Sequence, residues 1–145
     1  MDCKLKVDMI FYDLEIYELS IKEKKLEFFA SKSISIILVF NLDERDSFEN
    51  LGNQILRIQS LNNETNLYIL GSSINNKPST STDEVNALLQ TCNFKADYNE
   101  IINFNQNSIE SFFNNVIKCS SESLKTRKKA DKSNISTSFE KCNIY

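Results

Sequence analysis

Apolar and polar residues along the chain follow patterns that predict a succession of strands and helices. Residues 5–13 (LKVDMIFYD) alternate and then run apolar, which predicts a strand. Residues 14–29 (LEIYELSIKEKKLEFF) are rich in Glu, Lys and Leu, which favour helix. Residues 34–40 (ISIILVF) are apolar on both faces. This last pattern predicts a strand in the middle of a sheet that is covered on both sides.

The next segments repeat the change from helical to strand spacing. Residues 43–60 carry one apolar stripe at helical spacing, formed by Phe48, Leu51, Ile55 and Ile58. Residues 66–70 (NLYIL) predict a third strand, which ends at Gly71. Residues 75–82 (NNKPSTST) have the Asn, Pro and Ser content of a loop.

Two further helices and one strand complete the pattern. Ser81 and Glu84 stand three residues apart, the spacing of a capping box, and Asn107 and Glu110 repeat it. Residues 96–102 (ADYNEII) predict a fourth strand between these helices. Apolar stripes follow both caps: Val85, Leu88, Leu89 and Cys92 in the first helix, and Ile109, Phe112, Phe113, Val116 and Ile117 in the second.

The resulting order, βαβαβαβα, predicts an α/β fold in three layers, with a mostly parallel sheet, right-handed crossovers and helices on both faces. From Ser120 onward the pattern dissolves into Ser, Lys, Thr and Asn. We therefore expect a folded domain over residues 1–119 and a disordered tail over residues 120–145. The tail holds six Lys or Arg and three Asp or Glu, a net charge of +3. The whole chain carries −3, so the first 119 residues carry −6.

Composition excludes several kinds of chemistry. The 145 residues contain no histidine, the commonest general base near neutral pH and the commonest zinc ligand, and we expect no metal site. The four cysteines form no CxxC pair, as expected for reduced thiols in an intracellular protein. The acidic balance argues against nucleic acid as a partner.

The longest apolar run, residues 36–40, is too short to span a bilayer. With two glycines, the chain has no GxxxxGK[ST] and no GxGxxG phosphate-binding loop.

Residues 36–58 (IILVFNLDERDSFENLGNQILRI) resemble the Rab small GTPases of the Ras superfamily. Members commonly carry an apolar strand, then D-x-T-x-x-x-S-F-x-N, then a helix; Asn41, Asp43, Ser47, Phe48 and Asn50 stand in that register. The resemblance extends by order of elements over about the first 118 residues. Residues 11–18 (FYDLEIYE) stand at the W-D-T-A-G-Q-E segment, residues 69–75 (ILGSSIN) at G-N-K-x-D, and residues 101–113 (IINFNQNSIESFF) at the S-A-K region. None of these motifs is intact.

The departures from the family predict the loss of catalysis. Asp13 fits the magnesium-associated aspartate, and a turn aspartate at a strand end is the alternative. Ile16 replaces the glycine whose N–H meets the γ-phosphate, and Tyr17 replaces the glutamine that orients the attacking water. A tyrosine has no carboxamide, so it cannot both accept from the water and donate to the phosphate. The resemblance therefore implies a protein that does not hydrolyse GTP.

The loop that recognises the guanine base in the family is altered as well. Ser72 and Ser73 stand at the family's asparagine and lysine, and Asn75 stands at its aspartate. An asparagine leaves one guanine donor mismatched, at a cost of about 1–3 kcal/mol if buried. The resemblance thus makes Asp13, Ser72 and Asn75 a vestigial nucleotide site, and ordinary loop chemistry is the alternative for the serines. We expect no cofactor; GTP and magnesium would enter only if a nucleotide-binding segment preceded this chain.

The chain begins where the family has its third strand, without the preceding strands, phosphate loop and first switch. We therefore describe the fold as an incomplete small-GTPase-like P-loop fold. In the family, the missing first strand lies between the third and fourth strands. We expect residues 5–13 to take its place and to pair in parallel with residues 34–40, leaving apolar surface exposed on one face. Open strand edges, or a longer gene product, are the alternatives.

Two functions remain open from the sequence. The first is a degenerate, non-hydrolysing Rab-like interaction module that binds protein partners in intracellular vesicle and membrane trafficking. The second is a fragment of a functional GTP-binding Rab GTPase whose nucleotide-binding segment lies elsewhere. A small α/β binding domain that shares only the architecture is a third class.

The tail suggests where such a protein would act. Cys142 is fourth from the end, in CNIY, the spacing of a C-a-a-X prenylation signal, although Asn143 is not aliphatic. The basic cluster KTRKK (residues 125–129) would add about 1 kcal/mol per charge at an anionic membrane. A free thiol and a solvated charge run are the alternatives. We expect a cytoplasmic protein with peripheral contact to an intracellular membrane.

Overall fold

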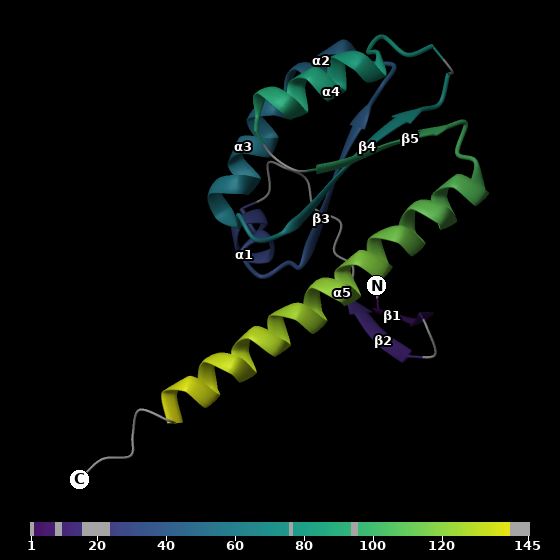
Figure 1. Cartoon of the computed structure of the whole chain (residues 1–145). Coiled ribbons are helices and arrows are strands. Elements are labelled where there is room, and N and C mark those ends of the chain that lie inside the picture. The colour runs from purple at the N-terminus through teal and green to yellow at the C-terminus, as the bar shows by residue number, and fades with distance from the viewer. Residues whose placement is uncertain (1, 8–9, 16–23, 76, 94–95, 140–145) are drawn as a thin grey trace.

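A computed structural model describes residues 2–7, 10–15, 24–75, 77–93 and 96–139, and side chains within residues 24–127 of these ranges (Figure 1). Its centre is a three-stranded sheet of β3 (Ser35–Asn41), β4 (Asn66–Ser73) and β5 (Ala96–Ile102). The strands are all parallel, in the order β3-β4-β5. The three strands predicted at residues 34–40, 66–70 and 96–102 are thus confirmed, but the end expected at Gly71 is wrong, because β4 continues through Gly71 to Ser73.

Helices α1 (Leu26–Ala30), α3 (Leu51–Leu61) and α4 (Thr82–Thr91) cover one face of this sheet, and Phe48 of the short helix before α3 packs against the same side. Their apolar stripes meet strand residues such as Leu38, Phe40 and Ile69 in one buried cluster. Leu51, Ile55, Ile58 and Val85 are fully buried there. The stripes predicted over residues 48–58 and 85–92 therefore face the core. The predicted helix over residues 43–60 divides at Asn50 into α2 (Arg45–Glu49) and α3.

The long helix α5 (Gln106–Phe139) lies on the opposite face (Figure 1). Phe112 and Val116 pack on Tyr68, Leu70 and Ile101 of the sheet in a second buried cluster. Helices on both faces of a parallel sheet give the three layers that the sequence predicts. The cap of α5 differs from the prediction: Asn105, rather than Asn107, accepts a hydrogen bond from the amide of Ser108, at 3.2 Å.

Helix α5 continues past Ser120, where the sequence predicted its end and a disordered tail. The boundary expected at residue 119 therefore lies within a helix. The serines beyond it hold the helix to the starts of the strands: Ser120 and Ser35 share a hydrogen bond of 2.6 Å, and Asn66 donates to Ser123 at 2.8 Å. The Arg127 guanidinium donates to the carbonyl of Glu64. Because these contacts are polar, hydrophobic periodicity could not reveal them.

The N-terminal segment differs most from the prediction. β1 (Asp2–Val7) and β2 (Ile10–Glu15) form an antiparallel hairpin in a sheet of their own, where one strand over residues 5–13 was expected. The expected pairing of that strand with residues 34–40 is wrong, because β3 pairs with β4 alone among the described strands. Strands close in sequence pair at little loop-closure cost. Of the helix expected over residues 14–29, the described part contains only α1 and the end of β2.

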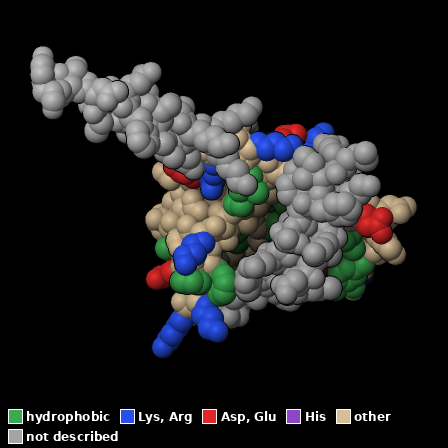
Figure 2. All heavy atoms as spheres, turned by 90° about the horizontal axis from the view of Figure 1, so that it is seen from below, with side chains coloured by type: hydrophobic (Ala, Val, Ile, Leu, Met, Phe, Trp, Pro, Cys, Tyr) green, Lys and Arg blue, Asp and Glu red, His purple; other side chains and the backbone are tan. Residues whose placement is uncertain are grey.

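The β3 edge of the sheet carries apolar surface that α5 leaves open. Val39 follows Ile37 on the face that α5 covers, yet 60% of Val39 is exposed. Figure 2 views the molecule from the end at which β3 and β4 begin, and shows hydrophobic side chains around a hollow. Exposure of one valine is ordinary for a protein surface, so the expectation of uncovered apolar surface on one face stays a prediction.

Candidate functional site

The residues predicted for a vestigial nucleotide site lie on two separate sheets. Asp13 is on β2 of the hairpin, with its side chain outside the described part. Ser72 is near the end of β4, and Asn75 follows in the loop to α4. Ser72 and Asn75 thus belong to one strand–loop segment, whereas Asp13 is on the other sheet and the contacts of its side chain lie outside the described part. Ile16, Tyr17 and Cys142 lie outside the described residues.

Asp43 organises the loop in which Ser72 and Asn75 lie. It stands just after β3, and its carboxylate accepts hydrogen bonds from the Ser73 hydroxyl at 2.6 Å and from the amides of Ile74 and Asn75 at 3.1 and 3.0 Å. The Ser73 bond is the main cause that lowers the pKa of Asp43, and the amide bonds lower it further. The carboxylate thus accepts from all three of these donors, which the loop directs toward the end of β3.

The serines of this loop also serve the fold. Ser72 donates a long hydrogen bond of 3.4 Å to the carbonyl of Phe40, and Ser73 is buried with its hydroxyl on Asp43. This finding favours the alternative interpretation of the two serines as loop chemistry. A signal for Asp43 was present in the sequence. The carboxyl ends of adjacent parallel strands meet, so an aspartate after one strand can reach the loop after the next.

The residues in the Rab-like register build the turn after β3. The amide of Asn41 donates to the Ser47 hydroxyl at 2.9 Å, and the side-chain oxygen of Asn41 accepts from the amide of Asp43 at 3.0 Å. These two bonds aim Asp43 at the neighbouring loop. The spacing of Asn41, Asp43 and Ser47 therefore has a local structural reason in this chain.

A second polar link joins α2 to the start of α4. Ser81 and Glu84 form the predicted capping box, in which each side chain bonds the other's backbone amide. Arg45 reaches across from α2 and pairs with Glu84 at 2.7 Å. The Ser81 amide and then Arg45 lower the pKa of Glu84 to about 2. Both side chains are exposed, so this pair mainly fixes the position of the loop before α4.

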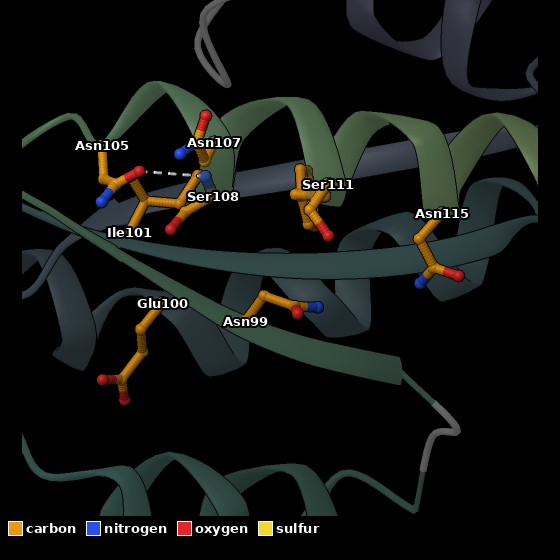
Figure 3. A pocket seen from close by; sticks show the side chains of 9 residues that line it. Asn99, Glu100, Ile101, Asn105, Asn107, Ser108, Ser111 and Asn115 are labelled. Carbon is orange, nitrogen blue, oxygen red and sulfur yellow. Dashed lines mark hydrogen bonds between the residues drawn. The ribbon is translucent and has the colours of Figure 1, made fainter.

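A cleft of about 520 Å³ lies between β5 and α5 (Figure 3). Four asparagines and two serines line it, together with Glu100, Ile101 and Phe112: Asn99, Asn105, Asn107, Asn115, Ser108 and Ser111. Asn107, Ser111 and Asn115 recur every four residues, which places them on one face of the helix. The sequence analysis missed this polar stripe because it followed the apolar one.

The lining of the cleft offers mainly neutral polar groups. Its one carboxylate, Glu100, points away from α5 (Figure 3) and accepts hydrogen bonds from the hydroxyls of Tyr98 and Thr82 at 2.6 and 2.8 Å. The chain has no histidine. Neither Ser108 nor Ser111 has a base among the residues that line the cleft, so neither is activated as a nucleophile.

Large apolar side chains are exposed at the end where the strands finish. They are Ile74 after β4, Ile102 at the end of β5, and Phe104, of which 60% is exposed. Asn103 and Phe104 both have a positive φ, 54° and 46°. A bulky residue is rarely found in this left-handed region, because its side chain crowds the backbone. The turn therefore holds an aromatic ring in solvent at a cost in backbone strain.

Within the described residues, no group of three or more His, Cys, Asp or Glu is placed to hold a metal ion. None of the helices in that part of the chain is long and apolar enough to cross a membrane. No family model and no curated protein matches the sequence. The resemblance to Rab proteins thus rests on the partial motifs alone.

Proposed function

We propose that this chain is a non-catalytic, Rab-like interaction module that acts with protein partners of vesicle and membrane trafficking. The observation that carries the proposal is the closure of the β4–α4 loop by Asp43. In the family that the sequence resembles, this loop reads the base. Here a carboxylate of the chain itself takes the Ser73 hydroxyl and the amides of Ile74 and Asn75.

The closed loop argues against nucleotide at this end of the sheet. Any ligand oxygen that approached the two amides would have to displace Asp43. The lowered pKa of Asp43 means that the carboxylate keeps its charge at neutral pH, and this charge repels phosphate. Neither a GxxxxGK[ST] loop nor a histidine is present in the sequence to supply binding or chemistry elsewhere.

The exposed side chains of Ile74, Ile102 and Phe104 support a role in binding proteins. Aromatic and apolar anchors carry much of the affinity in protein interfaces. The strained turn holds Phe104 outward, where burial in the fold would otherwise be favourable. The basic segment from residue 125 onward adds a peripheral contact to an anionic intracellular membrane.

Titration with a fluorescent GTP analogue and magnesium tests the loss of nucleotide binding. We expect no saturable signal up to about 10 µM protein, which corresponds to less than about 7 kcal/mol of binding free energy. Saturable, magnesium-dependent binding would contradict the proposal and support a GTP-binding protein instead. A small GTPase of known activity, measured in the same buffer, serves as the positive control.

Proximity labelling in cells tests the interaction role. The double variant Ile102→Ser, Phe104→Ser should lose labelled trafficking proteins relative to wild type. Leu56→Ser is the matched control, because Leu56 is 53% exposed on α3. Equal labelling by the double variant and the wild type would show that this end of the sheet is not the binding surface.

A further inference from the structure

We infer that two copies of this chain associate through the edge of β3, joining their sheets antiparallel about a two-fold axis that passes through Ile37. The inference goes beyond the proposed function and does not depend on it. It rests on the direction of the main-chain groups of β3, on the absence of charge along this strand, and on the exposure of Val39.

The hydrogen bonds at the two ends of β3 show which main-chain groups face β4. The amide of Asn66 donates to the carbonyl of Ile34, and the amide of Leu42 donates to the carbonyl of Ser72. In a parallel ladder, alternate residues bond to the same neighbour. The even-numbered residues of β3 therefore bond β4, and the odd-numbered residues turn their N–H and C=O groups to the open edge.

Four odd-numbered residues lie on β3, and among the described residues only the last of them, Asn41, has partners for its outward groups. The Asn41 amide donates to Ser47, and its carbonyl accepts from the amide of Glu44 at 3.3 Å. The outward groups of Ser35, Ile37 and Val39 have no partner within the described part of the chain. With respect to the described residues, three consecutive sites for pairing are thus open along one edge.

The two edges of the sheet differ in how they are protected. β5, at the other edge, carries Asp97 and Glu100, and charged side chains discourage strand addition. β3 (SIILVFN) has no charge and no proline. An uncharged apolar edge is a template for pairing with another strand.

The open groups of β3 complement a second copy of themselves. With the axis at Ile37, Ser35 faces Val39 of the second copy, and Ile37 faces its own equivalent. Each pair exchanges two hydrogen bonds, so every open group finds a partner and Asn41 is not needed. No like charges oppose one another across the strands. A six-stranded sheet of ordinary size results.

The same arrangement covers the exposed apolar side chain. Val39, 60% exposed in one chain, would lie beside Ser35 of the second copy, where that copy's α5 approaches through its bond between Ser35 and Ser120. Ile37 would pack against its equivalent at the axis. Cross-strand pairs of β-branched residues stabilise sheets.

Sedimentation equilibrium from about 1 to 100 µM tests the association. The wild-type mass should rise from 16.7 kDa toward twice that value. Val39→Pro removes only an outward donor and leaves the bonds to β4 intact, so it should remain a folded monomer. Val39→Lys is a second variant that keeps the donor and adds repulsion. Leu56→Lys, at an exposed apolar position on α3, should associate like the wild type.

Cross-linking tests the register. Ile37→Cys, in a chain whose native cysteines are serines, should form a disulfide between copies, because paired residues at the axis have Cα atoms about 5.5 Å apart. Leu56→Cys should not. A monomeric wild type, folded Val39 variants that still dimerise, a Leu56→Lys monomer, or no cross-link at Ile37→Cys would each overturn the inference.

Discussion

Replacing Gly71 by alanine tests the packing that positions the closed loop. Gly71 lies in β4, two residues before the Ser73 that bonds Asp43. A Cβ at this position would stand 3.0 Å from Cγ and Cδ2 of Leu42 and 3.0 Å from the hydroxyl of Tyr98. Leu42 is buried, and the Tyr98 hydroxyl is held by Glu100. Neither neighbour can move without losing packing or a hydrogen bond.

The expected cost follows from these contacts. One extra methyl group in a packed core costs about 1–3 kcal/mol. Alanine also restricts the unfolded chain and so returns about 0.4–1 kcal/mol. With the middle of each range, Gly71→Ala should therefore lower the free energy of unfolding by about 1–2 kcal/mol. With a urea m-value near 2 kcal/mol/M, the midpoint should fall by roughly 0.5–1 M.

Urea denaturation followed by circular dichroism measures this change, with Gly52→Ala as the control. Gly52 is in helix α3, and its added Cβ would meet only a terminal methyl group of Leu88, at 3.1 Å. Alanine favours helix over glycine by about 1 kcal/mol, so this variant should be as stable as wild type or more stable. A Gly71→Ala protein that equals the wild type, or a Gly52→Ala protein that loses more, would refute the packing described for Gly71.

Three further predictions test other parts of the structure. Ile55→Ala should cost about 2–5 kcal/mol in urea denaturation because Ile55 is fully buried, whereas the adjacent, exposed Leu56→Ala should cost little. The pKa of Glu84 is lowered to about 2, so its contribution to stability is complete above its ordinary pKa of 4.5 and is lost as the pH falls toward about 2. Glu84→Gln should therefore flatten the pH dependence of the urea midpoint between about pH 4.5 and 2. If the terminal CNIY is lipidated, Cys142→Ser should move a tagged protein from membranes to cytosol in fractionation; equal cytosolic distribution of both would refute lipidation.

Much of the fold could be predicted from the sequence because the residues that a helix buries are apolar and recur at helical spacing. The stripe through Leu51, Ile55 and Ile58 and the stripe through Val85 and Leu89 both face the core, as their spacing indicates. The capping box at Ser81 marks the start of α4 correctly. These features are local, so a few neighbouring residues are enough to specify them.

The candidate site could be predicted less well from the sequence pattern, because it depends on which loops lie next to each other in the fold. In the sequence, Asp43 is one of several acidic residues in a turn. It reaches Ser73 only because β3 and β4 are adjacent in the sheet. The polar stripe of Asn107, Ser111 and Asn115 lies on the same helix as a clear apolar stripe, and polar positions on a helix are usually solvated. The extension of α5 past Ser120 likewise depends on serine contacts to strands far away in the sequence.

The wrong prediction for β3 shows what the side-chain pattern of a strand indicates: whether its two faces are covered, and not how many strands lie beside it. Leu38 and Phe40 face the helices α1, α3 and α4, and Ile37 faces α5, so the strand is apolar on both sides. We expected from this pattern a strand with a neighbour on each edge. Side chains point to the two faces of a sheet, however, and main-chain groups point to its edges. Apolar residues on both faces therefore require helices above and below, and they leave the number of neighbouring strands undetermined. Within the described part of the chain, the missing neighbour shows itself in the outward groups of Ser35, Ile37 and Val39, which have no partner there. These are the groups through which a second copy can join the sheet.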